Sequence, residues 1–156
     1  MVETVDREKI ADALQKGLED HVREDPLKIL VQVNPAEEDT KSGITDNESL
    51  IKLVQHIRDK CPKLQFQGLM VIGRPGKLED LDQLVAYKSL LIKEFPDLEQ
   101  LSPFELSMGM SDDYKEAVRK LLDTMGMLLT PSRLLEEAPT CALEALSLVL
   151  VKVERE

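Results

Sequence analysis

The stretch "LKILVQVN", residues 27–34, decides the fold class, because it is a nearly continuous apolar run of strand length. Such a run, rich in β-branched residues and without polar alternation, predicts a strand that is buried on both faces. "LQFQGLMVIG" predicts a second buried strand over residues 64–72, and "FELSMGM", residues 104–110, predicts a third. Strands of this kind are typical of parallel sheets covered by helices.

Helical patterns alternate with these strands. Asp6 can cap a helix over residues 6–20, and Thr45 with Glu48 forms a capping box for a second helix that ends before Pro62. A third helical pattern follows the turn "GRPG" and continues to Phe95-Pro96. This order predicts the α/β class, with parallel strands, right-handed crossovers and helices on the outside. Three strands are few for such a domain, so part of the sheet is missing from this interpretation.

Length and charge limit the function classes. The 156 residues fit one domain, and 30 acidic against 20 basic residues give a net charge of −10, which would repel nucleic acid and anionic membranes. No apolar run is long enough to span a bilayer, and the charged start lacks a secretory signal, so we expect a soluble cytoplasmic protein, with mitochondria as the open alternative. Cys61 and Cys141 show no metal-binding spacing, so we predict reduced thiols and no metal site.

The junction "FELSMGMSDDYKEAV", residues 104–118, is the strongest candidate binding site. It predicts a strand, a tight turn and a helix that begins at Ser111, at the carboxyl end of a strand where α/β proteins bind ligands. The Ser111 hydroxyl and the free amides of the first helical turn could bind a phosphate, and Gly109 allows close approach of the backbone. The alternative is that Ser111 only caps its helix while Met108 and Met110 fill the core.

Three segments together resemble the pyridoxal-phosphate homeostasis proteins, the YggS/PROSC family. They are "KILVQVNPAEEDTKSGI", "CPKLQFQGLMVIG" and "FELSMGMSDDYKEAV", and the likeness covers residues 2–118, with "LSMGMS" as its most specific motif. The resemblance implies part of an alanine-racemase-like (β/α)8 TIM barrel that binds pyridoxal 5′-phosphate without catalysing a reaction. It also implies a role in intracellular vitamin B6 homeostasis and a monomeric state, whereas open strand edges predict self-association.

The resemblance also assigns roles to individual residues. Ser111 matches the serine that binds the cofactor phosphate, and Met110, Gly109 and Met70 match residues that line the cofactor pocket. The set Asn34, Lys41 and Gly43 matches a segment at the barrel mouth, where Lys41 fits an exposed loop charge better than a ligand contact. No catalytic residue is predicted.

The chain departs from the family at both ends. No residue matches the Schiff-base lysine, and Lys28 lies at the wrong end of its strand. A whole barrel needs about 250 residues. We therefore expect a partial cofactor-binding barrel domain over residues 1–118 and a helical tail over residues 119–156 that is unlike the family.

The tail carries a trace of the family in another reading frame. Read from the third base of the codon for Glu136, sixteen successive triplets can encode "GSTNVRIGSTIFGARE", which is approximately the ending of the family. We hypothesise that residues from about Arg119 onward come from a displaced frame, so the family's pyridine-nitrogen arginine is absent as protein. Sequencing the transcript across this junction tests the hypothesis, because an in-frame genomic sequence that cannot regroup in this way would refute it.

The sequence leaves three functions open. The first is a non-catalytic, truncated homeostasis protein that still binds pyridoxal phosphate, and the second is a non-functional or interaction-only barrel fragment. The third is a pyridoxal-phosphate-dependent amino-acid racemase, which would need a Schiff-base lysine and an opposed acid/base group, neither of which the sequence offers.

Overall fold

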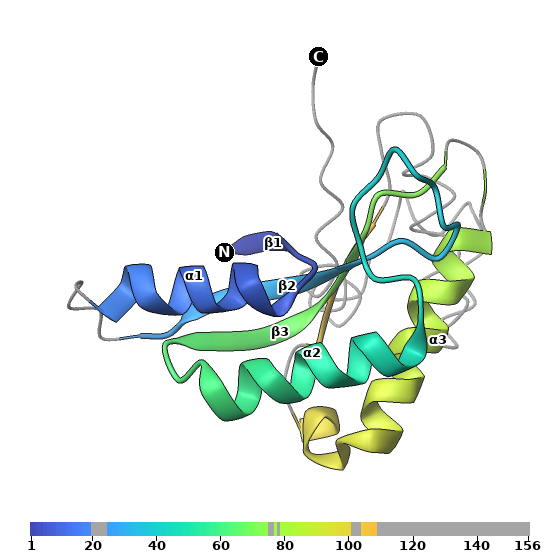
Figure 1. The fold of residues 1–156 in the computed structure, drawn as a ribbon. Coiled ribbons are helices and arrows are strands. Elements are labelled where there is room, and N and C mark those ends of the chain that lie inside the picture. Colours follow the sequence, from blue (N-terminus) through green and yellow to red (C-terminus); the bar gives the residue numbers. More distant parts are fainter. Residues whose placement is uncertain (20–24, 75–76, 78, 101–103, 109–156) are drawn as a thin grey trace, which may run out of the picture.

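A parallel four-stranded sheet with helices against it forms the described part of the protein (Figure 1). The computed structural model describes residues 1–19, 25–74, 77, 79–100 and 104–108. The strands lie in chain order, β1-β2-β3-β4, and every pairing is parallel. The elements are β1 (Val2–Val5), α1 (Glu8–Glu19), β2 (Leu27–Val33), α2 (Asn47–Lys60), β3 (Leu64–Val71), α3 (Glu79–Glu94), a 3₁₀ helix (Pro96–Gln100) and β4 (Glu105–Ser107).

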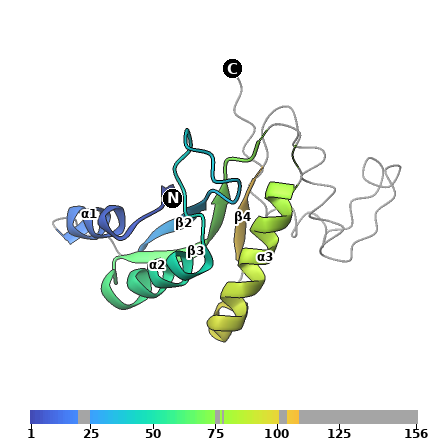
Figure 2. The same cartoon turned by 45° about the vertical axis from the view of Figure 1, so that its right-hand side comes forward.

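The three helices α1, α2 and α3 cover one face of the sheet (Figures 1 and 2). This arrangement of sequential parallel strands with outer helices confirms the predicted α/β class, and it is that of successive units of a (β/α) barrel. The core lies between the sheet and the helices, and its main members are Ile29, Val31, Val33, Leu50, Leu53, Val54, Ile57, Phe66, Leu69, Val71, Leu81, Leu84 and Leu91.

Strands β2 and β3 are buried on both faces, as their apolar runs predicted. Ile29, Val31 and Val33 of β2 point into the helix-covered core, so the residues between them point to the opposite face, which we call the inner face of the sheet. Leu30 on that face is fully buried, and Met70 of β3 is 8% exposed.

Strand β1 is the part of the sheet that the sequence interpretation missed. Its four residues, "VETV", pair with β2 in parallel, and only Val5 is fully buried. Two polar residues in so short a segment hide the apolar signal that revealed β2 and β3. The predicted number of strands was therefore wrong by one.

The N-terminal caps of α1 and α2 each lie one residue after the predicted position. The Arg7 carbonyl accepts the first bond of α1, and the Asp6 carboxylate instead accepts hydrogen bonds from the Arg7 side chain. Asp46, rather than Thr45, caps α2, and its carboxylate accepts a 2.8 Å hydrogen bond from the Ser49 amide. Thr45 contributes its carbonyl, which accepts a 3.1 Å hydrogen bond from the Tyr87 hydroxyl. Both corrections leave the helices where the sequence predicted them.

A β-bulge shapes the middle of the sheet. The register of β2 with β3 passes from Ile29 opposite Phe66 to Leu30 opposite Gly68, so Gln67 is the extra residue. A Cβ atom at Gly68 would lie 1.8 Å from the Glu105 carbonyl oxygen, so only glycine lets β4 approach here.

The sheet is curved enough for its first and last strands to touch through side chains. The Ser107 hydroxyl of β4 donates a 2.8 Å hydrogen bond to Glu3 Oε2 of β1, although β2 and β3 lie between them in the sheet. In a flat sheet these strands would stand about 14 Å apart, three times the spacing of neighbouring strands. The inner face is therefore strongly concave, as in the wall of a barrel.

The predicted tail, residues 119–156, lies outside the described residues, as does the turn that begins at Gly109. Among the residues that the structure describes, no helix is long and apolar enough to cross a membrane.

Candidate functional site

The carboxyl ends of β2, β3 and β4 meet at one edge of the sheet, which we call the carboxyl edge. Met70 pairs in register with Gln32 on one side and Ser107 on the other, so the three residues form a row across the sheet. All three are buried, and their strand positions place them on the inner face. Ligands of parallel α/β proteins bind beyond this edge, and the role of Met70 as a pocket-lining residue stays a prediction.

The loop after β2 is held in shape by Asn34. Its amide donates to the carbonyls of Glu38 and Lys41 at 2.9 and 3.0 Å, and its side-chain oxygen accepts from the Glu38 amide at 3.3 Å. Asn34 is 6% exposed, so its polar atoms have exchanged water for these partners. Its role here is to position the loop.

Gly43 lets the end of this loop return to β2. Its φ is +132°, and a Cβ atom would lie 2.7 Å from the Val33 carbonyl carbon, so both conformation and space exclude a side chain. Ile44 then pairs with Val33, and the Gln32 side chain donates a 2.7 Å hydrogen bond to the Ser42 carbonyl. The match of Gly43 to the family segment therefore has a structural reason.

Lys41 joins the ends of two strands. Its ammonium donates a 3.1 Å hydrogen bond to the Gly73 carbonyl just after β3, and it forms an ion pair with Glu38. Its side chain is 22% exposed. The expectation of an exposed loop charge is wrong for Lys41, because the side chain bridges the loops that follow β2 and β3.

Arg74 is the second cation near the carboxyl edge. Its guanidinium donates to both carboxylate oxygens of Asp80, at 2.6 and 3.1 Å, and its amide donates to Asp80 at 2.8 Å. The side-chain hydrogen bond from Arg74 is the main reason that the pKa of Asp80 lies below its ordinary value. Lys41 and Arg74 are thus both engaged by carboxylates of the protein.

A buried carboxyl lies on the inner face. Glu105 is 7% exposed, and within the described part of the chain its Oε2 has no hydrogen-bond partner. Burial raises the pKa of Glu105, with a further upward contribution from Glu3 and opposing ones from Lys28 and the N-terminus. The sequence interpretation passed over Glu105 and Ser107, although their alternation with the core residue Leu106 could have placed them together on the opposite face.

The remaining predicted site residues divide into two groups. Gly109, Met110 and Ser111 lie outside the described residues, although β4 ends only two residues before Gly109. Lys28 is the second residue of β2 and exposed, so it stands at the amino end of the strand, as predicted. Of the four predicted cofactor-binding residues, the structure therefore describes Met70. It also describes β4, the strand that precedes Gly109, Met110 and Ser111.

Comparison with known proteins finds relatives that carry the name of the family that the sequence motifs resemble. No family model matches the chain, but it is 38% identical over 125 residues to the mouse protein named pyridoxal phosphate homeostasis protein, covering 76% of this chain and 44% of the mouse protein. Over the aligned residues, this chain is homologous to the pyridoxal phosphate homeostasis proteins. It spans about half the length of the curated relatives it matches.

Two solved structures of one protein have a similar fold. PipY from Synechococcus elongatus, solved without pyridoxal phosphate, matches with a TM-score of 0.61 at 29% identity, over 76% of this chain and 54% of PipY. The PipY structure with pyridoxal phosphate bound matches with a TM-score of 0.58 at 26% identity, over 76% of this chain and 53% of PipY. The fold of the matched residues is thus one that another protein combines with this cofactor.

Proposed function

We propose that this chain binds pyridoxal 5′-phosphate at the carboxyl edge and takes part in vitamin B6 homeostasis without catalysing a reaction. The observation that carries the proposal is the likeness to PipY with the cofactor bound, together with relatives named for pyridoxal phosphate homeostasis. Because the chain spans about half of those relatives, the activity of the whole protein is part of the proposal.

The residues at the carboxyl edge fit such a ligand in a defined way. Met70 and Ser107 lie side by side on the buried inner face, a mixed apolar and polar surface suited to an aromatic ring with polar substituents. The phosphate would bind to the Ser111 hydroxyl and the amides that follow it, with Gly109 and Met110 lining the approach. Lys41 and Arg74 would not compete for it, because both are already paired with carboxylates.

The same geometry argues for reversible binding. Pyridoxal phosphate supplies an aldehyde that reacts with lysine amines, and such chemistry needs an unengaged amine beside the bound ring. Lys41 donates to the Gly73 carbonyl and pairs with Glu38, and Lys28 is at the other end of β2. We therefore expect a non-covalent complex.

The test combines absorbance, borohydride reduction and mass spectrometry of the full chain with pyridoxal phosphate. We expect the spectrum of a bound free aldehyde, no mass gain after reduction, and at least tenfold weaker binding for Ser111→Ala, the expected loss of one charge-assisted hydrogen bond. Ser89→Ala, far along α3, is the matched control and should bind normally. Affinity that Ser111→Ala leaves unchanged would contradict the proposed phosphate site.

A fragment without cofactor affinity is the second candidate function. Among the described strands, β1 and β4 end the sheet on each side, and unpaired strand edges favour association between chains. In that case size-exclusion chromatography would show concentration-dependent oligomers, and pyridoxal phosphate would not alter them. An adduct fixed by borohydride would instead favour the racemase-like alternative.

A further inference from the structure

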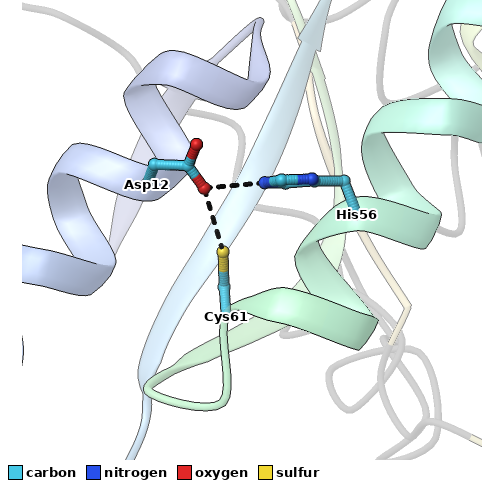
Figure 3. Close-up of side chains that lie close together, drawn as sticks. All are labelled: Asp12, His56 and Cys61. Carbon is cyan, nitrogen blue, oxygen red and sulfur yellow. Dashed lines mark hydrogen bonds and ion pairs between the residues drawn. The ribbon is translucent and has the colours of Figure 1, made fainter.

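A mixed cluster of metal-binding side chains lies on the helix side of the sheet, away from the carboxyl edge. Asp12 comes from α1, His56 from α2 and Cys61 from the residue after α2, and their side chains point toward one another (Figure 3). Asp12 Oδ1 is 2.7 Å from His56 Nε2 and 4.0 Å from Cys61 Sγ. The three ligand atoms all lie within 4.8 Å of one another.

Regular structure holds each of these residues in place. Helices α1 and α2 pack side by side, and the Cys61 amide donates a 3.0 Å hydrogen bond to the Ile57 carbonyl as it ends α2. Cys61 is buried and the His56 side chain is 21% exposed, whereas Asp12 is exposed. The cluster thus has a buried sulfur, a half-buried ring and one side open to water.

Neither of two simpler roles accounts for all three residues. An ion pair between α1 and α2 would use Asp12 and His56 but not the thiol. A reactive thiolate would need a positive charge close to the sulfur, and Cys61 Sγ instead lies 4.0 Å from the negatively charged carboxylate of Asp12. A cation placed between the three groups would neutralise the carboxylate and favour the deprotonated sulfur.

We propose that Asp12, His56 and Cys61 bind a divalent transition-metal ion, with zinc as the best match. Zinc takes carboxylate oxygen, imidazole nitrogen and thiolate sulfur in tetrahedral geometry, with bond lengths of about 2.0–2.3 Å. Those bonds place ligand atoms about 3.3–3.6 Å apart. Asp12 and His56 must separate slightly from 2.7 Å, and Cys61 must approach Asp12 from 4.0 Å. The fourth position is left to water.

Glu8 supports this use of His56. Its Oε2 lies 3.9 Å from His56 Nδ1, on the ring side opposite Asp12. The two groups make no hydrogen bond at that distance, but a carboxylate on this side of the ring favours a proton on Nδ1 electrostatically and leaves Nε2 to bind metal. Binding releases the thiol proton of Cys61 to solvent, so affinity increases with pH.

Cobalt(II) chloride is the probe, because a cobalt–thiolate bond gives a charge-transfer absorption that water and carboxylate ligands do not give. We expect one equivalent of Co²⁺ to produce this absorption in the full chain and Zn²⁺ to abolish it by displacement. Cys61→Ser should remove the band, and His56→Asn and Asp12→Asn should each weaken binding at least tenfold. Glu8→Gln should weaken binding less than His56→Asn does, because Glu8 makes no hydrogen bond to the ring.

The chain supplies its own matched controls, because it contains one other cysteine and one other histidine. Cys141→Ser and His21→Asn should leave the absorption and its midpoint unchanged. Circular dichroism of each variant separates loss of metal binding from loss of folding, and His56→Asn, at a half-exposed position, still tests the site if Cys61→Ser fails to fold. Absence of the cobalt–thiolate band, or its loss in Cys141→Ser, would overturn the proposal.

Discussion

Gly68 is the residue on which the approach of β4 to β3 depends. Gly68→Ala would place a Cβ atom 1.8 Å from the Glu105 carbonyl oxygen, and backbone cannot yield as a flexible side chain can. We expect the variant to lower the free energy of unfolding by at least about 3 kcal/mol, the upper range for overpacking. Urea unfolding followed by circular dichroism measures the change.

Gly17 provides the matched control for that substitution. A Cβ atom at Gly17 in α1 meets nothing within 4 Å, and alanine is the better helix former. Gly17→Ala should therefore raise stability by up to about 1 kcal/mol. If Gly68→Ala were as stable as the native chain, the described pairing of β3 with β4 would be wrong.

Asp80 should make stability depend on pH in the acid range. Its folded pKa lies below its ordinary value because Arg74 donates to its carboxylate, so the stabilisation is present above the unfolded pKa and is lost as pH falls through the folded pKa. Asp80→Asn should cost about 2 kcal/mol at pH 7, as for a charge-assisted hydrogen bond. It should also flatten the acid limb of a plot of urea midpoint against pH.

The exposed ion pair of Glu48 with Lys52 on α2 is the comparison for Asp80. Because both partners are in water, Glu48→Gln should cost less than about 0.5 kcal/mol. Equal costs for the two variants would mean that the burial of Asp80 does not strengthen its pairing with Arg74.

Glu105 should have the opposite effect on pH dependence. Burial raises its pKa in the folded protein, so the folded state holds the proton longer and stability falls as pH rises through the window between the unfolded and folded values. Glu105→Gln removes this penalty. We expect a gain in the urea midpoint at pH 7 and little change at pH 4, and a gain equal at both pH values would contradict the assignment.

At the scale of elements, the residue that caps α2 differs between the structure, where it is Asp46, and the sequence prediction, where it is Thr45. Asp46→Ala should cost about 1 kcal/mol, because the carboxylate that accepts from the Ser49 amide is lost. Thr45→Ala should cost less, since Thr45 contributes a backbone carbonyl to Tyr87. Thermal unfolding of the two variants compares the caps directly, and a larger loss for Thr45→Ala would restore the predicted capping box.

The sequence revealed the elements whose burial is strongest. The runs at residues 27–34 and 64–72 are apolar on both faces, so β2 and β3 were predictable from composition alone, as was the alternation with helices. Strand β1 was not, because Glu3 and Thr4 dilute its apolar content and its pairing partner, β2, is distant in sequence. The caps shifted because Asp46 and Thr45 are both good capping residues, and only backbone geometry chooses between them.

The candidate sites were predictable to different degrees for similar reasons. Met70 was proposed from the family resemblance alone, and the structure adds that it lies near the end of β3. The cluster of Asp12, His56 and Cys61 could not be found from spacing, because Asp12 is 44 residues from His56 and only the packing of α1 against α2 brings them together. A motif search sees neighbours in the chain, whereas these ligands are neighbours in space.

At the scale of the whole molecule, one hydrogen bond couples the two ends of the described chain. Ser107 and Glu3 are 104 residues apart in sequence, and closing so long a loop is entropically costly, so β1 and β4 should dock after β2 has paired with β3. Native-state hydrogen exchange should find the slowest amides in β2 and β3 and faster ones in β1 and β4. Uniform protection across the four strands would argue against this order.

The hydrogen bond between Glu3 and Ser107 makes the position of β4 depend on the N-terminal residues. Deleting the few residues that carry Glu3 would leave the Ser107 hydroxyl without its acceptor and remove one of the contacts that hold β4, the strand from which the predicted phosphate-binding turn starts. A change at the N-terminus would then alter ligand affinity at the predicted turn, which lies more than a hundred residues away.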